Sequence, residues 1–227
     1  MPEEYYLNKL YPFQDRVLKM IQDLDAGFYL TGGTALGRYF LNHRYSDGLD
    51  LFVNADEQFR AQCNLVIGEL AERNIKYEVG VAAESFVRLM LIENDTLLKL
   101  DFVNDISFRY GTVIDTAIFN RVDNWRNILS NKLCAISRME VKDIVDILFI
   151  ALEYEFNWEE IFKEAEQKDI WVNPLEIAKI IESFPKERLR EIKWIKPVKL
   201  PVLGSKVDQL CKDLFYGESN SLFGTAN

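Results

Sequence analysis

Two short stretches decide the fold of this chain: Phe28-Tyr29-Leu30-Thr31-Gly32-Gly33-Thr34-Ala35-Leu36 and Arg44-Tyr45-Ser46-Asp47-Gly48-Leu49-Asp50-Leu51-Phe52-Val53. The first is an apolar run that ends in a glycine pair, and the second is an acidic cluster that opens another apolar run. This order predicts a strand, a tight turn, a helix and a second strand. The glycines let the backbone turn sharply and approach a ligand closely. The helix that begins at Thr34 offers free N–H groups that suit a phosphate.

The second predicted strand runs from about Gly48 to Val53, and it places Asp50 toward whatever the glycine turn holds. Three further strand candidates follow, at 75–79, 86–92 and 97–103. The last of them carries Asp101 between two bulky apolar residues, where a carboxylate is costly to bury without a partner. Two interpretations stay open. Asp101 is a metal ligand or general base, or it forms a salt bridge with a neighbouring lysine or arginine.

Helical periodicity occupies much of the remaining chain. Apolar residues recur at helical spacing over 7–24 and 57–74, and the pattern is helical almost throughout after Asn124. The longest such segment, 125–152, is expected to form one helix. We therefore expect an α+β protein with two domains, a sheet-containing domain over 1–120 and a helical domain over 121–227.

The glycine turn, the Arg-x-Ser-Asp-x-Leu-Asp segment and a Lys/Asp-rich helix over 132–146 occur in one order. Together they resemble the AbiEii/AbiGii toxin-type nucleotidyltransferases of the DNA polymerase β-like superfamily. The resemblance implies a mixed β-sheet flanked by helices and followed by a mainly α-helical lobe. It also implies transfer of a nucleoside monophosphate from a nucleoside triphosphate (NTP) to a hydroxyl of an RNA, such as a tRNA, or of a protein. Such an enzyme would act as the toxin of a toxin–antitoxin or phage-defence system, with an antitoxin protein as its partner.

The resemblance also implies the site residues. The expected nucleotide-binding residues lie on the turn, beside it and on the later helix: Gly32, Gly33, Thr34, Arg44, Lys132, Lys142, Asp143 and Asp146. The expected catalytic carboxylates, which would hold Mg²⁺ or Mn²⁺, are Asp47, Asp50 and Asp101. From its spacing alone, Arg44 suits a second role as a brace for the Asp47 carboxylate.

The chain departs from the family pattern at Gly48. The first acidic residue of the expected Asp-x-Asp pair falls on this glycine, which has no ligand atom. Asp47 is one residue too early and points to the opposite face of a regular strand, unless a β-bulge turns it back. The alternative to an enzyme is therefore a catalytically silent nucleotide- or protein-binding module of the same fold.

The bulk composition limits the class of protein. The 227 residues are 48% hydrophobic, and the three cysteines are widely spaced, which favours neither a disulfide framework nor a zinc site. With no apolar run near the roughly 18 residues of a membrane span and no signal-peptide layout, we expect a cytoplasmic protein without a membrane partner. The net charge of −9 argues against nonspecific nucleic-acid binding by the whole surface. Residues 186–212, with eight basic and three acidic side chains, suit either a solvated face or an RNA backbone.

Overall fold

The structure is a computed structural model that describes residues 2–225, so the predicted outer domain limits at 1 and 227 lie outside the described residues. The chain forms two compact units. Unit 1 comprises Met1–Ala35 and Tyr45–Asn124, and unit 2 comprises Leu36–Arg44 and Trp125–Asn227. The division into domains at residue 120 stays a prediction, because contacts alone do not show which parts fold independently.

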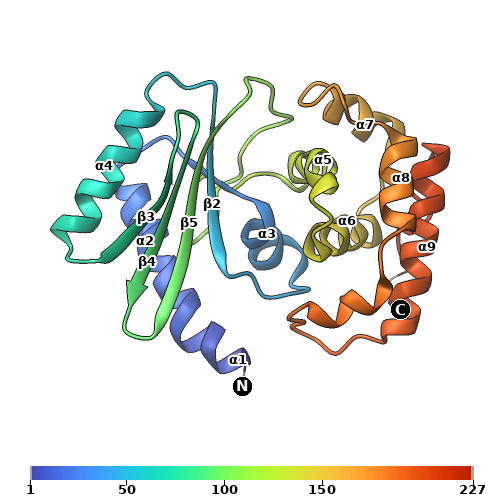
Figure 1. Ribbon diagram of the computed structural model, residues 1–227, viewed down its shortest axis with the longest axis horizontal. Helices are drawn as coiled ribbons and strands as arrows, with labels where there is room; N and C mark the ends of the chain where they lie inside the picture. Colours follow the sequence, from blue (N-terminus) through green and yellow to red (C-terminus); the bar gives the residue numbers. More distant parts are fainter. Residues whose placement is uncertain (1, 226–227) are drawn as a thin grey trace. The chain divides into compact units, whose positions relative to one another are not determined.

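Unit 1 is built on a five-stranded mixed sheet with the order β1-β2-β5-β4-β3 (Figure 1). Strand β1 (Tyr29–Thr31) pairs antiparallel with β2 (Gly48–Asn54), and β2 pairs parallel with β5 (Thr96–Asp105). Strands β4 (Phe86–Glu93) and β3 (Lys76–Ala82) continue the sheet by antiparallel pairing. The predicted α+β class is confirmed.

One face of this sheet forms the core of unit 1. Helices α2 (Tyr11–Asp23) and α4 (Phe59–Glu72) lie on that face (Figure 1), and α2 continues the N-terminal helical turns of α1 (Pro2–Tyr5) and η1 (Tyr6–Leu10). Alternate residues of β2 and β5 point into this core and are fully or almost fully buried: Leu49, Leu51, Val53, Leu98, Leu100 and Phe102. The alternation leaves the intervening residues, including Gly48, Asp50, Lys99 and Asp101, to the opposite face.

A short helix begins at the glycine pair itself, two residues before the predicted start at Thr34, and the chain then passes from one unit into the other. Helix α3 (Gly32–Ala35) belongs to unit 1, and the π-helical turn η2 (Leu36–Leu41) that continues it belongs to unit 2. The chain returns to unit 1 at Tyr45, just ahead of β2.

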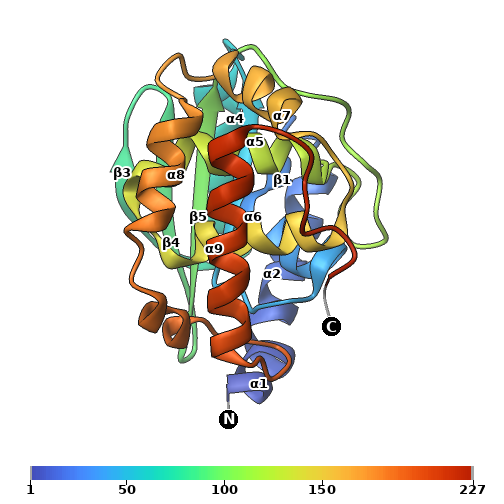
Figure 2. The same ribbon diagram turned by 90° about the vertical axis from the view of Figure 1, so that its right-hand side faces the viewer.

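From Trp125 on, all the described secondary-structure elements are helices. The helices are α5 (Trp125–Ala135), η3 (Ile136–Arg138), α6 (Val141–Glu153), α7 (Trp158–Glu166), α8 (Pro174–Glu182), η4 (Lys186–Glu191) and α9 (Leu200–Tyr216). Figure 2 shows α8 and α9 side by side. None of the described helices combines the length and the apolar character needed to cross a membrane.

The prediction of a single helix over 125–152 is wrong. The chain leaves α5 through the 3₁₀ turn η3, and Met139 then adopts a left-handed conformation with φ of 52° before α6 begins. A left-handed residue cannot continue a right-handed helix, so α5 and α6 are separate elements. No glycine or proline marks this break in the sequence.

Candidate active site

The open face of the unit 1 sheet brings two of the predicted carboxylates together. In the parallel pairing of β2 and β5, Asp50 lies opposite Asp101, and Gly48 lies opposite Lys99. The pairs are two residues apart, so all four residues share one face of the sheet. Asp101 is buried, with 4% of its surface exposed, whereas Asp50 is partly exposed.

Asp101 is held by two cationic side chains. Arg88 on β4 donates from Nε and Nη2 to the two carboxylate oxygens, at 2.7 Å and 2.8 Å. Lys99 Nζ lies 2.8 Å from Asp101 Oδ2 and 3.7 Å from Asp50 Oδ1. Burial alone would raise the pKa of Asp101, but the hydrogen bonds from Arg88 and Lys99 outweigh it and hold the pKa below its usual value. Asp101 is therefore ionised at neutral pH, and it forms the salt bridge that was one of its two expected roles.

The glycine turn lies directly against Asp50. Gly32 has a φ of +67°, and a Cβ built on it would lie 2.6 Å from Asp50 Oδ2. Only glycine meets both conditions, since other residues are strained at this φ and have no room for Cβ. Thr34 Oγ1 lies 2.9 Å from Ser46 Oγ and also donates to the carbonyl of Gly48. The Thr34 hydroxyl thus ties the turn to the start of β2.

Asp47 does not join the pair. Asp47 precedes β2, whose register with β5 is continuous from Gly48 to Asn54. Its carboxylate instead accepts a hydrogen bond from the Tyr6 hydroxyl. Burial raises the pKa of Tyr6 above its usual range, and the hydrogen bond to Asp47 adds to that effect, so Tyr6 remains a neutral donor. The described residues hold no cluster of three or more His, Cys, Asp or Glu side chains that could bind a metal ion.

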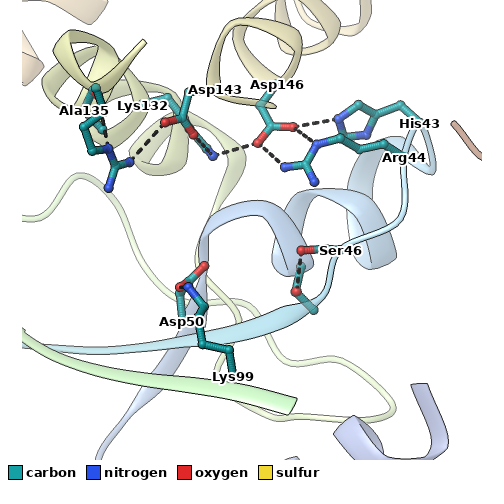
Figure 3. Close-up of polar contacts among 11 residues, drawn as sticks. His43, Arg44, Ser46, Asp50, Lys99, Lys132, Ala135, Asp143 and Asp146 are labelled. Carbon is teal, nitrogen blue, oxygen red and sulfur yellow. Dashed lines mark hydrogen bonds and ion pairs between the residues drawn. The ribbon is translucent and has the colours of Figure 1, made fainter. Parts of the chain in front are cut away.

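Unit 2 contains the second group of predicted residues, organised around a fully buried Asp146 (Figure 3). Arg44 donates from Nε and Nη2 to the two oxygens of Asp146, at 2.7 Å and 2.6 Å. His43 Nε2 lies 2.8 Å from Asp146 Oδ1, and Lys132 Nζ lies 2.7 Å from Oδ2. Burial would raise the pKa of Asp146, but Arg44 and Lys132 hold it well below its usual value.

Lys132 connects this carboxylate to a second one. Its Nζ lies 2.5 Å from Asp143 Oδ1, and Arg138 Nη2 lies 3.1 Å from Asp143 Oδ2. Burial would lower the pKa of Lys132, but Asp146 and Asp143 raise it above the usual value, so the lysine stays charged. Lys142, by contrast, is exposed. The structure therefore brings Arg44, Lys132, Asp143 and Asp146 together and leaves Lys142 on the surface of α6.

Four partners in these clusters were not among the site residues predicted from the sequence: Arg88, Lys99, Arg138 and His43. The position of Lys99 could have been predicted from the sequence, because it stands two residues before Asp101 and must share its strand face. Arg88 comes from another strand, and its register is invisible in the sequence. His43 lies about a hundred positions before Asp146 in the chain, and its ring binds that distant carboxylate.

The fold places the chain among proteins with a nucleotidyltransferase architecture. Two crystal structures from Helicobacter pylori share it: one described as a "putative nucleotidyltransferase" and one of the protein JHP933. Both are 19% identical to this chain with a TM-score of 0.60, and both alignments cover 89% of it. They cover 93% and 90% of the respective H. pylori chains. At this identity the similarity shows the fold alone. No curated protein gives a significant match.

The family follows from the sequence match. The model of the nucleotidyl transferase AbiEii toxin, type IV toxin–antitoxin system, matches residues 16–218. The chain therefore belongs to the AbiEii nucleotidyltransferase toxin family, and the recognition made from the two stretches around Gly32 and Asp50 is confirmed.

Proposed function

We propose that this chain transfers a nucleoside monophosphate from an NTP to a hydroxyl of an RNA, such as a tRNA, or of a protein, as the toxin of a toxin–antitoxin or phage-defence system. Family membership supports nucleotidyl transfer. The observation that carries the proposal is the placement of Asp50, in register with Asp101 and against the turn at Gly32. This arrangement lets one pair of carboxylates and one backbone turn act on the same phosphate group.

Asp50 and Asp101 fit a single divalent cation. Their carboxylates converge on one positive group, the Lys99 ammonium, which stands where a cation would bind. Carboxylate oxygens are the ligands that Mg²⁺ and Mn²⁺ prefer. Such an ion, when bound, neutralises charge that develops on the phosphate during transfer. Asp47 lies outside this pair, so we assign the metal to Asp50 and Asp101.

The remaining assignments concern the nucleotide. The turn at Gly32 and Gly33 presents backbone without side chains, which suits close contact with phosphate oxygens. The Thr34 hydroxyl binds the start of β2 and Arg44 binds Asp146, so we assign both residues a supporting role, each within its own unit. Lys132 is the residue of unit 2 that we assign to the triphosphate. It stays charged, and a phosphate would replace one of its two carboxylate partners.

A cavity of about 430 Å³ in unit 2 supports RNA as the acceptor. Three lysines of the basic segment line it, Lys196, Lys199 and Lys206, together with apolar side chains that include Phe149 and Leu152. Single-stranded RNA is commonly bound by lysines that meet its phosphates and by apolar or aromatic surfaces that meet its bases. The family name implies an antitoxin protein that would restrain the activity.

One observation favours the second candidate, a silent nucleotide- or protein-binding module. Position 48 lacks a carboxylate, and the charges of Asp50 and Asp101 are already balanced by Lys99 and Arg88. A chain that had lost metal-dependent activity would show this pattern.

A transfer assay with α-³²P-labelled NTPs separates the two candidates. Each NTP is incubated with Mg²⁺ and either bulk RNA or protein, using wild type, Asp50→Asn and the control Asp115→Asn, which changes an exposed aspartate of the same unit. We expect wild type and Asp115→Asn to label the acceptor equally and Asp50→Asn to lose about a hundredfold or more in rate. NTP binding without any label transfer would identify the silent module. Full activity in Asp50→Asn would refute the site.

A further inference from the structure

Gly48 and Lys99 form an interlocked pair across two strands. They are register partners, and a Cβ built on Gly48 would lie 2.8 Å from Lys99 Cε and 3.1 Å from the Lys99 carbonyl oxygen. The lysine side chain therefore runs over position 48, in the space that any side chain there would need. The absence of an acidic side chain at position 48 and the path of the Lys99 side chain therefore depend on each other.

The ammonium group at the end of that side chain closes the carboxylate pair. It is within hydrogen-bond distance of Asp101, at 2.8 Å, and 3.7 Å from Asp50. With Arg88, the cluster contains two cations and two anions, so it is neutral without any bound ion. Arg88 holds Asp101 through two hydrogen bonds, whereas Lys99 holds it through one, and the two side chains are similarly exposed, at 39% and 35%. Moving Lys99 away from the carboxylate pair therefore costs less free energy than moving Arg88.

We propose that Lys99 is an internal counter-cation that competes with the divalent ion for Asp50 and Asp101. The proposal rests on the proposed function in one respect, that these carboxylates bind a metal ion. While Lys99 holds the pair, metal affinity is low. The phosphates of an NTP offer the ammonium group another partner, so nucleotide binding draws Lys99 away and opens the carboxylates to the ion. Metal and nucleotide therefore bind cooperatively, and neither alone assembles the site.

The test is Mn²⁺ binding, measured by electron paramagnetic resonance and by calorimetry, without any turnover. The variants are Lys99→Met, which removes the charge and keeps the apolar stem, and Lys99→Arg, which keeps the charge. The matched control Lys76→Met removes an exposed lysine from β3 in the same unit. We expect Lys99→Met to bind Mn²⁺ about tenfold more tightly than wild type, and the other two variants to bind as wild type does. A non-hydrolysable NTP analogue should raise Mn²⁺ affinity in wild type and have a smaller effect in Lys99→Met.

Two results would overturn the inference, and Asp50→Asn tells them apart. If Lys99→Met binds Mn²⁺ no better than wild type while Asp50→Asn abolishes the binding, the carboxylate pair is a metal site and Lys99 does not compete for it. If neither wild type nor Lys99→Met binds Mn²⁺, with or without the nucleotide analogue, the proposed metal site fails and the competition fails with it. Thermal denaturation of each variant checks that it is folded.

Discussion

Restoring the acidic residue at position 48 should not restore the metal site unless Lys99 is also removed. The Gly48→Asp change places Cβ 2.8 Å from Lys99 Cε and 3.1 Å from its carbonyl oxygen. The side-chain contact relaxes when the flexible Lys99 stem shifts with its ammonium group still on the carboxylates, and the backbone contact must give by a few tenths of an ångström. We expect the single variant to lose about 1–3 kcal/mol of unfolding free energy, as overpacked sites do. Its Mn²⁺ affinity should rise little.

The double variant Gly48→Asp/Lys99→Ala removes the side-chain clash and the competing charge together. A unit charge about 4 Å away is worth roughly 4 kcal/mol at an effective dielectric of 20 and about 1 kcal/mol in bulk water. Because the Asp50 and Lys99 side chains are each about a third exposed, at 32% and 35%, an intermediate value applies. We expect a gain of about 2.7 kcal/mol, a hundredfold increase in Mn²⁺ affinity over wild type.

Calorimetric titration with Mn²⁺ and thermal denaturation measure both effects. The control is Gly68→Asp, which adds the same charge on α4, where a Cβ meets no atom within 4 Å. Tight Mn²⁺ binding by Gly48→Asp alone, with an unchanged melting temperature, would refute the reasoning, because it would mean that Lys99 does not occupy the space over position 48.

Four further predictions concern other residues of the two units. Gly32→Ala should lower the unfolding free energy by about 1–3 kcal/mol and weaken NTP binding, because alanine is strained at a φ of +67° and its Cβ would clash with the Asp50 carboxylate. Urea denaturation and NTP titration measure these two effects, and unchanged values would contradict the prediction. Asp146→Ala should cost about 3–5 kcal/mol in urea denaturation, because it removes the buried carboxylate that Arg44 and Lys132 share. Burial lowers the pKa of His43, so stability should fall as pH drops below about 6.5, and His43→Gln should flatten this dependence. Lys199→Glu, at the N-cap of α9, should weaken single-stranded RNA binding in fluorescence anisotropy, whereas Lys212→Glu, within α9 and outside the cavity, should not.

The unit 1 face could be predicted from the sequence in large part. A period of two places Gly48 with Asp50 and Lys99 with Asp101, and the apolar residues between them show which face is buried. The sequence also raises the question of a bulge at Asp47, but it cannot answer it. Strand register depends on pairing between segments about fifty residues apart, and the structure shows that the β2–β5 pairing begins at Gly48, one residue after Asp47.

The contacts of the unit 2 cluster could not be predicted from the sequence, for a different reason. Lys132 and Asp146 were placed on one helix by their spacing, whereas the left-handed Met139 separates them onto α5 and α6. Asp146 is held by His43 and Arg44, which come from a segment about a hundred positions earlier. Local periodicity carries no information on such contacts.

The most direct test of the account is a calorimetric titration of wild type with each NTP, with and without Mg²⁺, repeated on Asp50→Asn. Binding of at least one NTP that strengthens with Mg²⁺ in wild type, and does not strengthen in Asp50→Asn, is the predicted result. It would show that the carboxylate pair and the glycine turn act on the same ligand. NTP binding that is equal with and without Mg²⁺ in both proteins, or no NTP binding at all, would contradict the account.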